Sequence, residues 1–115
     1  MIIYISERSD IMTKFIMVTT TTDSEEEAKT IINALLEKRL VSCCQINPIH
    51  SKYYWHDKQE ENDEFIIHMK SKKELYKEIE KVIVDNHSYE VPQIVAYNIV
   101  DGLDSYLNWI EEETK

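Results

Sequence analysis

The chain has 115 residues, of which 43% are hydrophobic and 30% are charged. This length suits one domain with a single core. The formal net charge of -9 at pH 7 repels the phosphates of nucleic acids and of acidic membrane surfaces. Neither is therefore an expected partner, and we expect no nucleic acid in the function of the protein.

Several signals bear on the compartment. No segment approaches the ~20 apolar residues of a membrane span, and the apolar run at the N-terminus is too short for a secretory signal. The only cysteines, Cys43 and Cys44, are neighbours in the sequence, which is too close for an ordinary disulfide between separate elements. Reduced thiols favour an intracellular compartment, so we expect a cytoplasmic protein without a transmembrane segment.

The first half of the chain predicts a strand and then a helix. Residues 14–22, KFIMVTTTT, are rich in β-branched side chains, which is typical of a strand. Ser24 and Glu27 then have the spacing of a capping box, which predicts a helix up to about Arg39. Its apolar residues recur every three or four positions and predict one buried face: Ala28, Ile31, Ile32, Leu35 and Leu36.

A long hairpin is predicted next, with arms over residues 40–55 and 58–71. The second arm alternates apolar and polar side chains at strand period, and His56-Asp57 predicts the turn between the arms. Pro48 has no N–H to donate to a neighbouring strand, so it must lie at an edge, a bend or a bulge of the first arm.

The last third of the chain predicts a helix, a strand and a short helix. Ser71 and Glu74 repeat the capping-box spacing and predict a helix over about 72–86, followed by a strand over 91–100. A final helix is predicted from three apolar residues at helical spacing: Leu103, Leu107 and Ile110.

The order strand, helix, strand, strand, helix, strand, with a helix appended, predicts an α+β fold of the ferredoxin-like split βαβ type. Hairpin arms of about 14 residues would be some 45 Å long, whereas the predicted helices cover only ~24 Å. The hairpin therefore overhangs its own domain. Because its far end carries Tyr53, Tyr54 and Trp55, we expect it to pack on a neighbouring subunit in a cyclic oligomer.

Candidate catalytic and metal sites are weakly supported by spacing alone. Cys43 and Cys44 point to opposite faces of their strand, so they cannot share one active site with a histidine. His50 and His56 lie ~20 Å apart along the predicted strand and cannot bind one ion together. A metal site must therefore be assembled between distant segments or between subunits, with thiolate and imidazole favouring copper or zinc.

The stretch HSYEVPQIVAY, residues 87–97, links the second helix to the last strand. The carbonyl end of the helix dipole favours His87, and Pro92 keeps Val91 extended. A simple connection does not explain Tyr89 and Glu90, which are polar groups at the point where the chain returns to the sheet.

Five stretches in order, from about Lys14 to Glu112, resemble the CutA family of divalent-ion-tolerance proteins. They are TTTTDSEEEA, KRLVSCCQI, YYWHDKQEENDEFIIHMKS, HSYEVPQI and YLNWI. HSYEVPQI is similar to a His-Pro-Tyr-Glu-x-Pro signature of that family. The resemblance divides the chain into an N-terminal extension, residues 1–12, and a CutA-like domain, residues 13–115.

The resemblance implies a non-enzymatic subunit that forms a homotrimer through its long hairpin and takes part in tolerance of copper and other divalent cations. It also implies that seven residues line a cleft between subunits, where a divalent metal or a small ligand binds. These residues are Tyr53, Trp55, Glu64, Lys70, His87, Tyr89 and Glu90.

For a bound metal, copper or another divalent cation, His87 with Cys43 or Cys44 is the expected soft ligand set, and Glu90 the oxygen donor. Copper-binding members of the family are proposed to use a cysteine and two successive histidines, where this chain has Thr19, Asn86 and His87, so one of those ligands is retained. Two alternatives remain: a trimeric scaffold or signalling module that anchors a protein partner, and an enzyme acting through His87 and Glu90.

Overall fold

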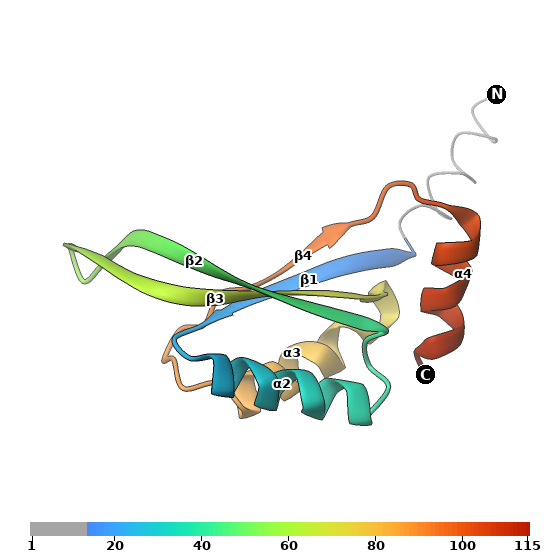
Figure 1. Ribbon diagram of the computed structural model, residues 1–115, viewed down its shortest axis with the longest axis horizontal. Helices are drawn as coiled ribbons and strands as arrows, with labels where there is room; N and C mark the ends of the chain where they lie inside the picture. Colours follow the sequence, from blue (N-terminus) through green and yellow to red (C-terminus); the bar gives the residue numbers. More distant parts are fainter. Residues whose placement is uncertain (1–13) are drawn as a thin grey trace.

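The computed structural model describes residues 14–115, so the expected extension at residues 1–12 lies outside the described residues. The described chain forms four strands and three α-helices (Figure 1). In chain order they are β1 (Phe15–Thr22), α2 (Glu25–Glu37), β2 (Cys43–Trp55), β3 (Lys58–Lys72), the short 3₁₀ helix η1 (Lys73–Leu75), α3 (Tyr76–Asp85), β4 (Ile94–Asn98) and α4 (Asp104–Glu113).

The four strands form one antiparallel sheet in the order β2-β3-β1-β4. The helices α2 and α3 lie against one face of this sheet, and α4 lies at one end of it (Figure 1). This arrangement confirms the predicted α+β, ferredoxin-like fold with a long hairpin and a C-terminal helix. No helix in the described part of the chain is both long enough and apolar enough to cross a membrane.

The main core lies between the sheet and the two helices. Ala28, Ile31 and Leu35 of α2 are fully buried there, as the apolar spacing predicts, whereas Leu36 is exposed. The N-terminus of α2 is fixed by Ser24, whose Oγ accepts the N–H of Glu27 at 3.1 Å. Burial of the apolar stripe and the cap together place α2 across the sheet.

The second helix begins later than the capping-box spacing predicts. Ser71 is not a cap: it belongs to β3 and pairs with Ile16, and its hydroxyl donates to the carbonyl oxygen of Leu40 at 2.6 Å. Strand pairing continues to Lys72, so α3 starts at Tyr76 after the 3₁₀ helix. The predicted helical segment therefore begins one residue late, at Lys73, and is α-helical only from Tyr76, because pairing with β1 outweighs the local helix-start signal at Ser71.

The last predicted strand is also shorter than expected. Only Ile94–Asn98 pairs with β1, whereas the apolar pattern extended over residues 91–100. The residues on either side, including the exposed Val91 and Val100, connect β4 to its neighbouring helices. Residues 86–93, between α3 and β4, are therefore outside the sheet pairing and cross the end of the sheet.

The hairpin β2-β3 extends well beyond the helices (Figure 1). Its 13-residue first arm is ~43 Å long at 3.3 Å per residue, while the 13 residues of α2 cover ~20 Å. The predicted turn is confirmed at His56 and Asp57, which both have positive φ, 51° and 64°. Pro48 lies in the edge strand β2, where a missing N–H is tolerated.

Candidate functional site

The segment between α3 and β4 crosses one end of the sheet and begins with a buried histidine. The side chain of His87 is fully buried, and its Nε2 lies 2.8 Å from the carbonyl oxygen of Thr21 in β1. Its Nδ1 accepts the backbone N–H of Tyr89 at 3.2 Å. Because Nδ1 accepts, the ring proton is on Nε2 and is donated to Thr21. Nε2 of His87 thus ties the segment to the sheet, while Nδ1 fixes the backbone of Tyr89 within the segment.

Further contacts hold this segment against α2 and set the position of Tyr89. The hydroxyl of Ser88 donates to Oε2 of Glu27 at 3.1 Å, and the rings of His87 and Tyr89 lie 4.8 Å apart between centroids. The position of Tyr89 is therefore set by the two residues that precede it, one packed on its ring and the other bonded to α2.

The central contact of the site joins Tyr89 to Glu64 of β3. The tyrosine hydroxyl donates to Oε2 of Glu64 at 2.6 Å, and Glu64 is only 6% exposed. Burial and the neighbouring Glu64 carboxylate raise the pKa of the Tyr89 hydroxyl above its ordinary value, so Tyr89 stays a hydrogen-bond donor at neutral pH. Two segments 25 residues apart in the sequence are thereby locked together.

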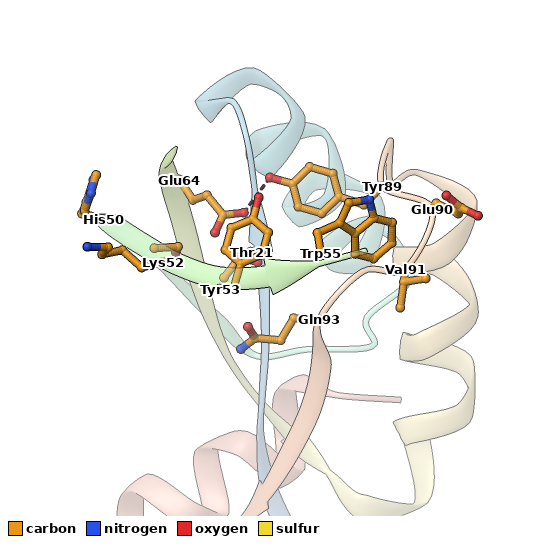
Figure 2. Close-up of a pocket in the computed structure, with 11 residues that line it drawn as sticks. Thr21, His50, Lys52, Tyr53, Trp55, Glu64, Tyr89, Glu90, Val91 and Gln93 are labelled. Carbon is orange, nitrogen blue, oxygen red and sulfur yellow. Dashed lines mark hydrogen bonds between the residues drawn. The ribbon is translucent and has the colours of Figure 1, made fainter. Parts of the chain in front are cut away.

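A cavity of about 580 Å³ lies around this pair, between the hairpin and the segment before β4 (Figure 2). Its volume is within the range of ~300–1,000 Å³ that is usual for small-molecule sites. Aromatic rings, carboxylates and a few other polar groups surround it. The lining residues are Thr21, His50, Ser51, Lys52, Tyr53, Trp55, Glu64, Tyr89, Glu90, Val91 and Gln93.

Five of the seven cleft residues named from the family resemblance line this cavity: Tyr53, Trp55, Glu64, Tyr89 and Glu90. The hydroxyl of Tyr53 is held by Oδ1 of Asn62 at 2.8 Å. The five come from β2, β3 and the segment before β4, so the fold collects them from three separate parts of the chain.

The other two, Lys70 and His87, do not line it. Lys70 is paired with Cys43 near the start of β2 and donates from Nζ to Oε1 of Gln45 at 2.7 Å. His87 lies under the segment, where it positions Tyr89. Their expected place in a cleft between subunits is not tested by the single chain.

His50, which the sequence analysis weighed only as a metal ligand with His56, also lines the cavity. Its Nδ1 lies 2.8 Å from Oδ1 of Asp63 and its Nε2 lies 2.7 Å from Oε2 of Glu61, across the hairpin in β3. These hydrogen bonds, first to Asp63 and then to Glu61, raise the pKa of His50. These contacts could not be predicted from the sequence, because they require the register of β2 against β3, which is set by the position of the turn.

The two cysteines lie at the other end of the hairpin from the cavity. Cys44 packs against the core, and burial raises the pKa of its thiol to about 12. Cys43 is on the opposite face, where burial and the neighbouring Cys43 thiol raise the pKa of the Tyr106 hydroxyl in α4. The predicted orientation of the two thiols to opposite faces is thus confirmed.

Within one subunit, the expected metal ligands are separated. Cys43 pairs with Lys70, which pairs with Met17 of β1, whereas His87 contacts Thr21, four residues further along β1. That separation is ~13 Å at 3.3 Å per residue. Among residues 14–115, no group of three or more His, Cys, Asp and Glu side chains is arranged to hold a metal ion.

Comparison with known proteins gives a consistent result. Residues 16–113 match the family model described as CutA1 divalent ion tolerance protein. The chain is 40% identical over 101 residues to the divalent-cation tolerance protein CutA of Archaeoglobus fulgidus, covering 88% of this chain and 97% of that protein. It is 34% identical over 100 residues to the protein of the same name from Pyrococcus horikoshii, covering 87% and 98%.

Solved structures agree with these sequence matches. The structure of the A. fulgidus protein, which is described as periplasmic, aligns with a TM-score of 0.86 at 37% identity, over 88% of this chain and 99% of that one. CutA1 from Oryza sativa also aligns with a TM-score of 0.86, at 28% identity, over 90% and 96%. Apart from Phe15 of β1, the matched region contains the four strands and three α-helices of the described chain, and the chain therefore belongs to the CutA1 divalent ion tolerance family.

Proposed function

We propose that this protein is a non-enzymatic homotrimer that contributes to tolerance of divalent metal ions, copper among them, and binds a cationic ligand in the cavity beside Glu64. The observation that carries the proposal is the buried Glu64 carboxylate, which opens on a cavity with aromatic walls. Membership of a divalent ion tolerance family supports the cellular role.

The proposed trimer rests on the shape and the exposed surface of the subunit. The hairpin overhangs the domain (Figure 1), and the aromatic residues Tyr53, Tyr54 and Trp55 near its tip are 43%, 72% and 39% exposed. A two-stranded ribbon of this kind is marginally stable in water unless another surface covers it. Contacts that repeat head to tail around a closed ring would cover the hairpin tip of each of the three subunits in the same way.

The assembly is tested by measuring the mass of the protein in solution. We expect sedimentation equilibrium to give three times the 13.7 kDa of one chain. Replacing the exposed apolar tip, in Tyr54→Asp with Trp55→Asp, should shift the mass toward that of one chain. A monomeric wild-type protein at micromolar concentration would contradict the proposal.

For metal binding, the expected ligands are Cys43 or Cys44, His87 and Glu90. Within one subunit, Cys43 and His87 lie beside positions of β1 that are ~13 Å apart along the strand. We therefore propose that such a site joins residues of different subunits, with the metal replacing the Tyr89 N–H at Nδ1 of His87. Copper(II) titrated into the reduced protein should then bind more tightly than millimolar. Cys43→Ser and His87→Ala should each weaken this binding, and an unchanged affinity in both variants would refute the metal site.

The alternative function is a trimeric scaffold or signalling module that anchors a partner protein, in which the cleft residues serve assembly. Glu90 distinguishes the two functions, because it lines the cavity without a hydrogen bond or ion pair to another residue of the described chain. If Glu90 pairs with a neighbouring subunit, Glu90→Gln should lower the melting temperature of the trimer. If it faces a ligand, the melting temperature without ligand should stay nearly unchanged.

We also propose a cytoplasmic location, supported by two free cysteines, which suit a reducing compartment. The A. fulgidus relative is described as periplasmic, so cell fractionation provides the test. Recovery of the protein in an oxidising compartment would contradict the proposal.

A further inference from the structure

Glu64 is a buried carboxylate whose partner in the described chain is a neutral group. Its Oε2 accepts from the Tyr89 hydroxyl at 2.6 Å, and no ion pair joins it to a lysine, arginine or histidine within residues 14–115. Buried charges in proteins are usually paired with an opposite charge, because removal from water is costly. The cavity beside Glu64 is therefore suited to a positively charged group.

The two basic residues of the lining do not supply that charge. Lys52 and His50 both extend away from Glu64 toward the far edge of the cavity (Figure 2). Both ring nitrogens of His50 are already engaged by Glu61 and Asp63. The positive charge that would complete the Glu64 site must come from outside the subunit.

The walls of the cavity add a second attraction for a cation. Three aromatic rings line it, those of Tyr53, Trp55 and Tyr89, and the faces of aromatic rings attract ammonium groups. The rings are held in place before a ligand arrives: Tyr89 donates to Glu64, and Tyr53 donates to Asn62 at 2.8 Å. Such preorganisation lowers the entropic cost of binding.

The size and ligand content of the cavity favour an organic cation over a metal ion. Zinc and copper require about four nitrogen, sulfur or oxygen ligands, and calcium six to eight oxygens. The described chain gathers no group of three such side chains. An organic ammonium needs only an acceptor and apolar or aromatic walls, and about 580 Å³ is the volume of a small-molecule site rather than of a bare ion.

We propose that the cavity binds a small organic ammonium compound, with its charged nitrogen at Glu64 and its carbon groups against Tyr53, Trp55 and Tyr89. This inference rests on the proposed function, which assigns the cavity as the ligand site, and it names the chemical class of the ligand. It is distinct from the thiol and imidazole metal site proposed between subunits.

The test compares two probes of nearly equal size and shape by isothermal titration calorimetry on the full-length protein. The first is 2-phenylethylammonium chloride, and the second is the neutral alcohol 2-phenylethanol. We expect the ammonium probe to bind and the alcohol to bind at least tenfold more weakly, because a hydrogen bond from a charged donor is worth about one to two powers of ten in affinity.

Two variants and a control locate the binding. Glu64→Gln keeps the shape and an acceptor for Tyr89 but removes the charge, and should weaken binding of the ammonium probe by roughly ten- to a hundredfold. Trp55→Leu, compared at a solution mass equal to that of the wild type, should weaken it several-fold through the lost ring face. Glu37→Gln makes the same charge change at an exposed site at the end of α2 and should leave the affinity unchanged.

The outcomes separate this inference from the proposed function. Equal binding of the alcohol, an unchanged affinity in Glu64→Gln, or no binding of the ammonium probe would each overturn the ammonium site. Zinc(II) bound in a manner that depends on Glu64, without binding of the ammonium probe, would overturn it too, while leaving a cationic ligand in the cavity. The trimer mass and the copper titration test the proposed function separately.

Discussion

Removal of the Tyr89 hydroxyl tests whether the Tyr89–Glu64 contact holds the site together. In Tyr89→Phe, the carboxylate of Glu64, only 6% exposed, loses a donor at 2.6 Å. Hydrogen bonds to charged groups contribute about 1.5–3 kcal/mol to stability. We therefore expect the free energy of unfolding to fall by about that amount, which corresponds to a decrease in melting temperature of roughly 5–15 °C for a domain of this size.

The assay is thermal unfolding by circular dichroism at matched protein concentrations, since an oligomer's melting temperature depends on concentration. The matched control is Tyr97→Phe in β4. Tyr97 is 53% exposed and lies away from the hairpin tip that we propose to be covered in the trimer, so the expected loss is below about 0.5 kcal/mol. The reasoning would be refuted if Tyr89→Phe lost no more stability than Tyr97→Phe.

The same contact predicts a pH dependence. Folding raises the pKa of Tyr89 above 10.0, so the folded state holds the phenolic proton more tightly than the unfolded state. The stabilisation is fully present below pH 10.0 and is lost as the pH rises from there toward the raised value. Tyr89→Phe should remove this part of the alkaline loss of stability, which equilibrium unfolding in urea at increasing pH will measure.

Three further predictions concern other parts of the chain. Iodoacetamide should alkylate Cys43 before Cys44 in the folded protein, because burial raises the pKa of Cys44 to about 12 and the thiolate is the reactive form; peptide mass spectrometry that found Cys44 modified first would contradict this. NMR titration should give His50 a pKa above 6.5, and Asp63→Asn should lower that pKa. An equal His50 pKa in the wild type and in Asp63→Asn would exclude the hydrogen bond between His50 and Asp63. Ser24→Ala should destabilise the protein by about 0.5–2 kcal/mol through loss of the α2 cap, and denaturant unfolding that detects no loss would exclude that role.

The sequence predicts the order of elements well because each element carries its own signal. The apolar stripe and the cap of Ser24 are local features of α2. The start of α3 was missed, since Ser71 offers a helix cap locally but is held in β3 by pairing with Ile16 and a hydrogen bond to Leu40. Interactions between distant segments decided this boundary, and a local pattern does not contain them.

The candidate site follows the same rule. Tyr89 and Glu90 stood out in the sequence because a simple connection gave them no role, and the family resemblance added Glu64. The contact between Tyr89 and Glu64 depends on how the 87–93 segment crosses the sheet, which becomes apparent in the fold. The place of His50 in the cavity was not predicted, because it depends on the hairpin register.

Two turns of the described chain adopt left-handed backbone conformations without glycine: Arg39, His56 and Asp57 have φ of 54°, 51° and 64°, and the last two form the hairpin turn. Each costs a side chain of the L configuration roughly 1–2 kcal/mol relative to its preferred regions, with Asp57 the most tolerant type. Glycine at Arg39 or His56 would relieve that cost. The ring of His56 packs against Trp55 of the cavity wall, with 4.7 Å between centroids, so glycine there would also disturb the ligand site. Arg39 lies away from the cavity, so a single change to glycine at that turn raises heat resistance without altering the ligand site or repacking the core.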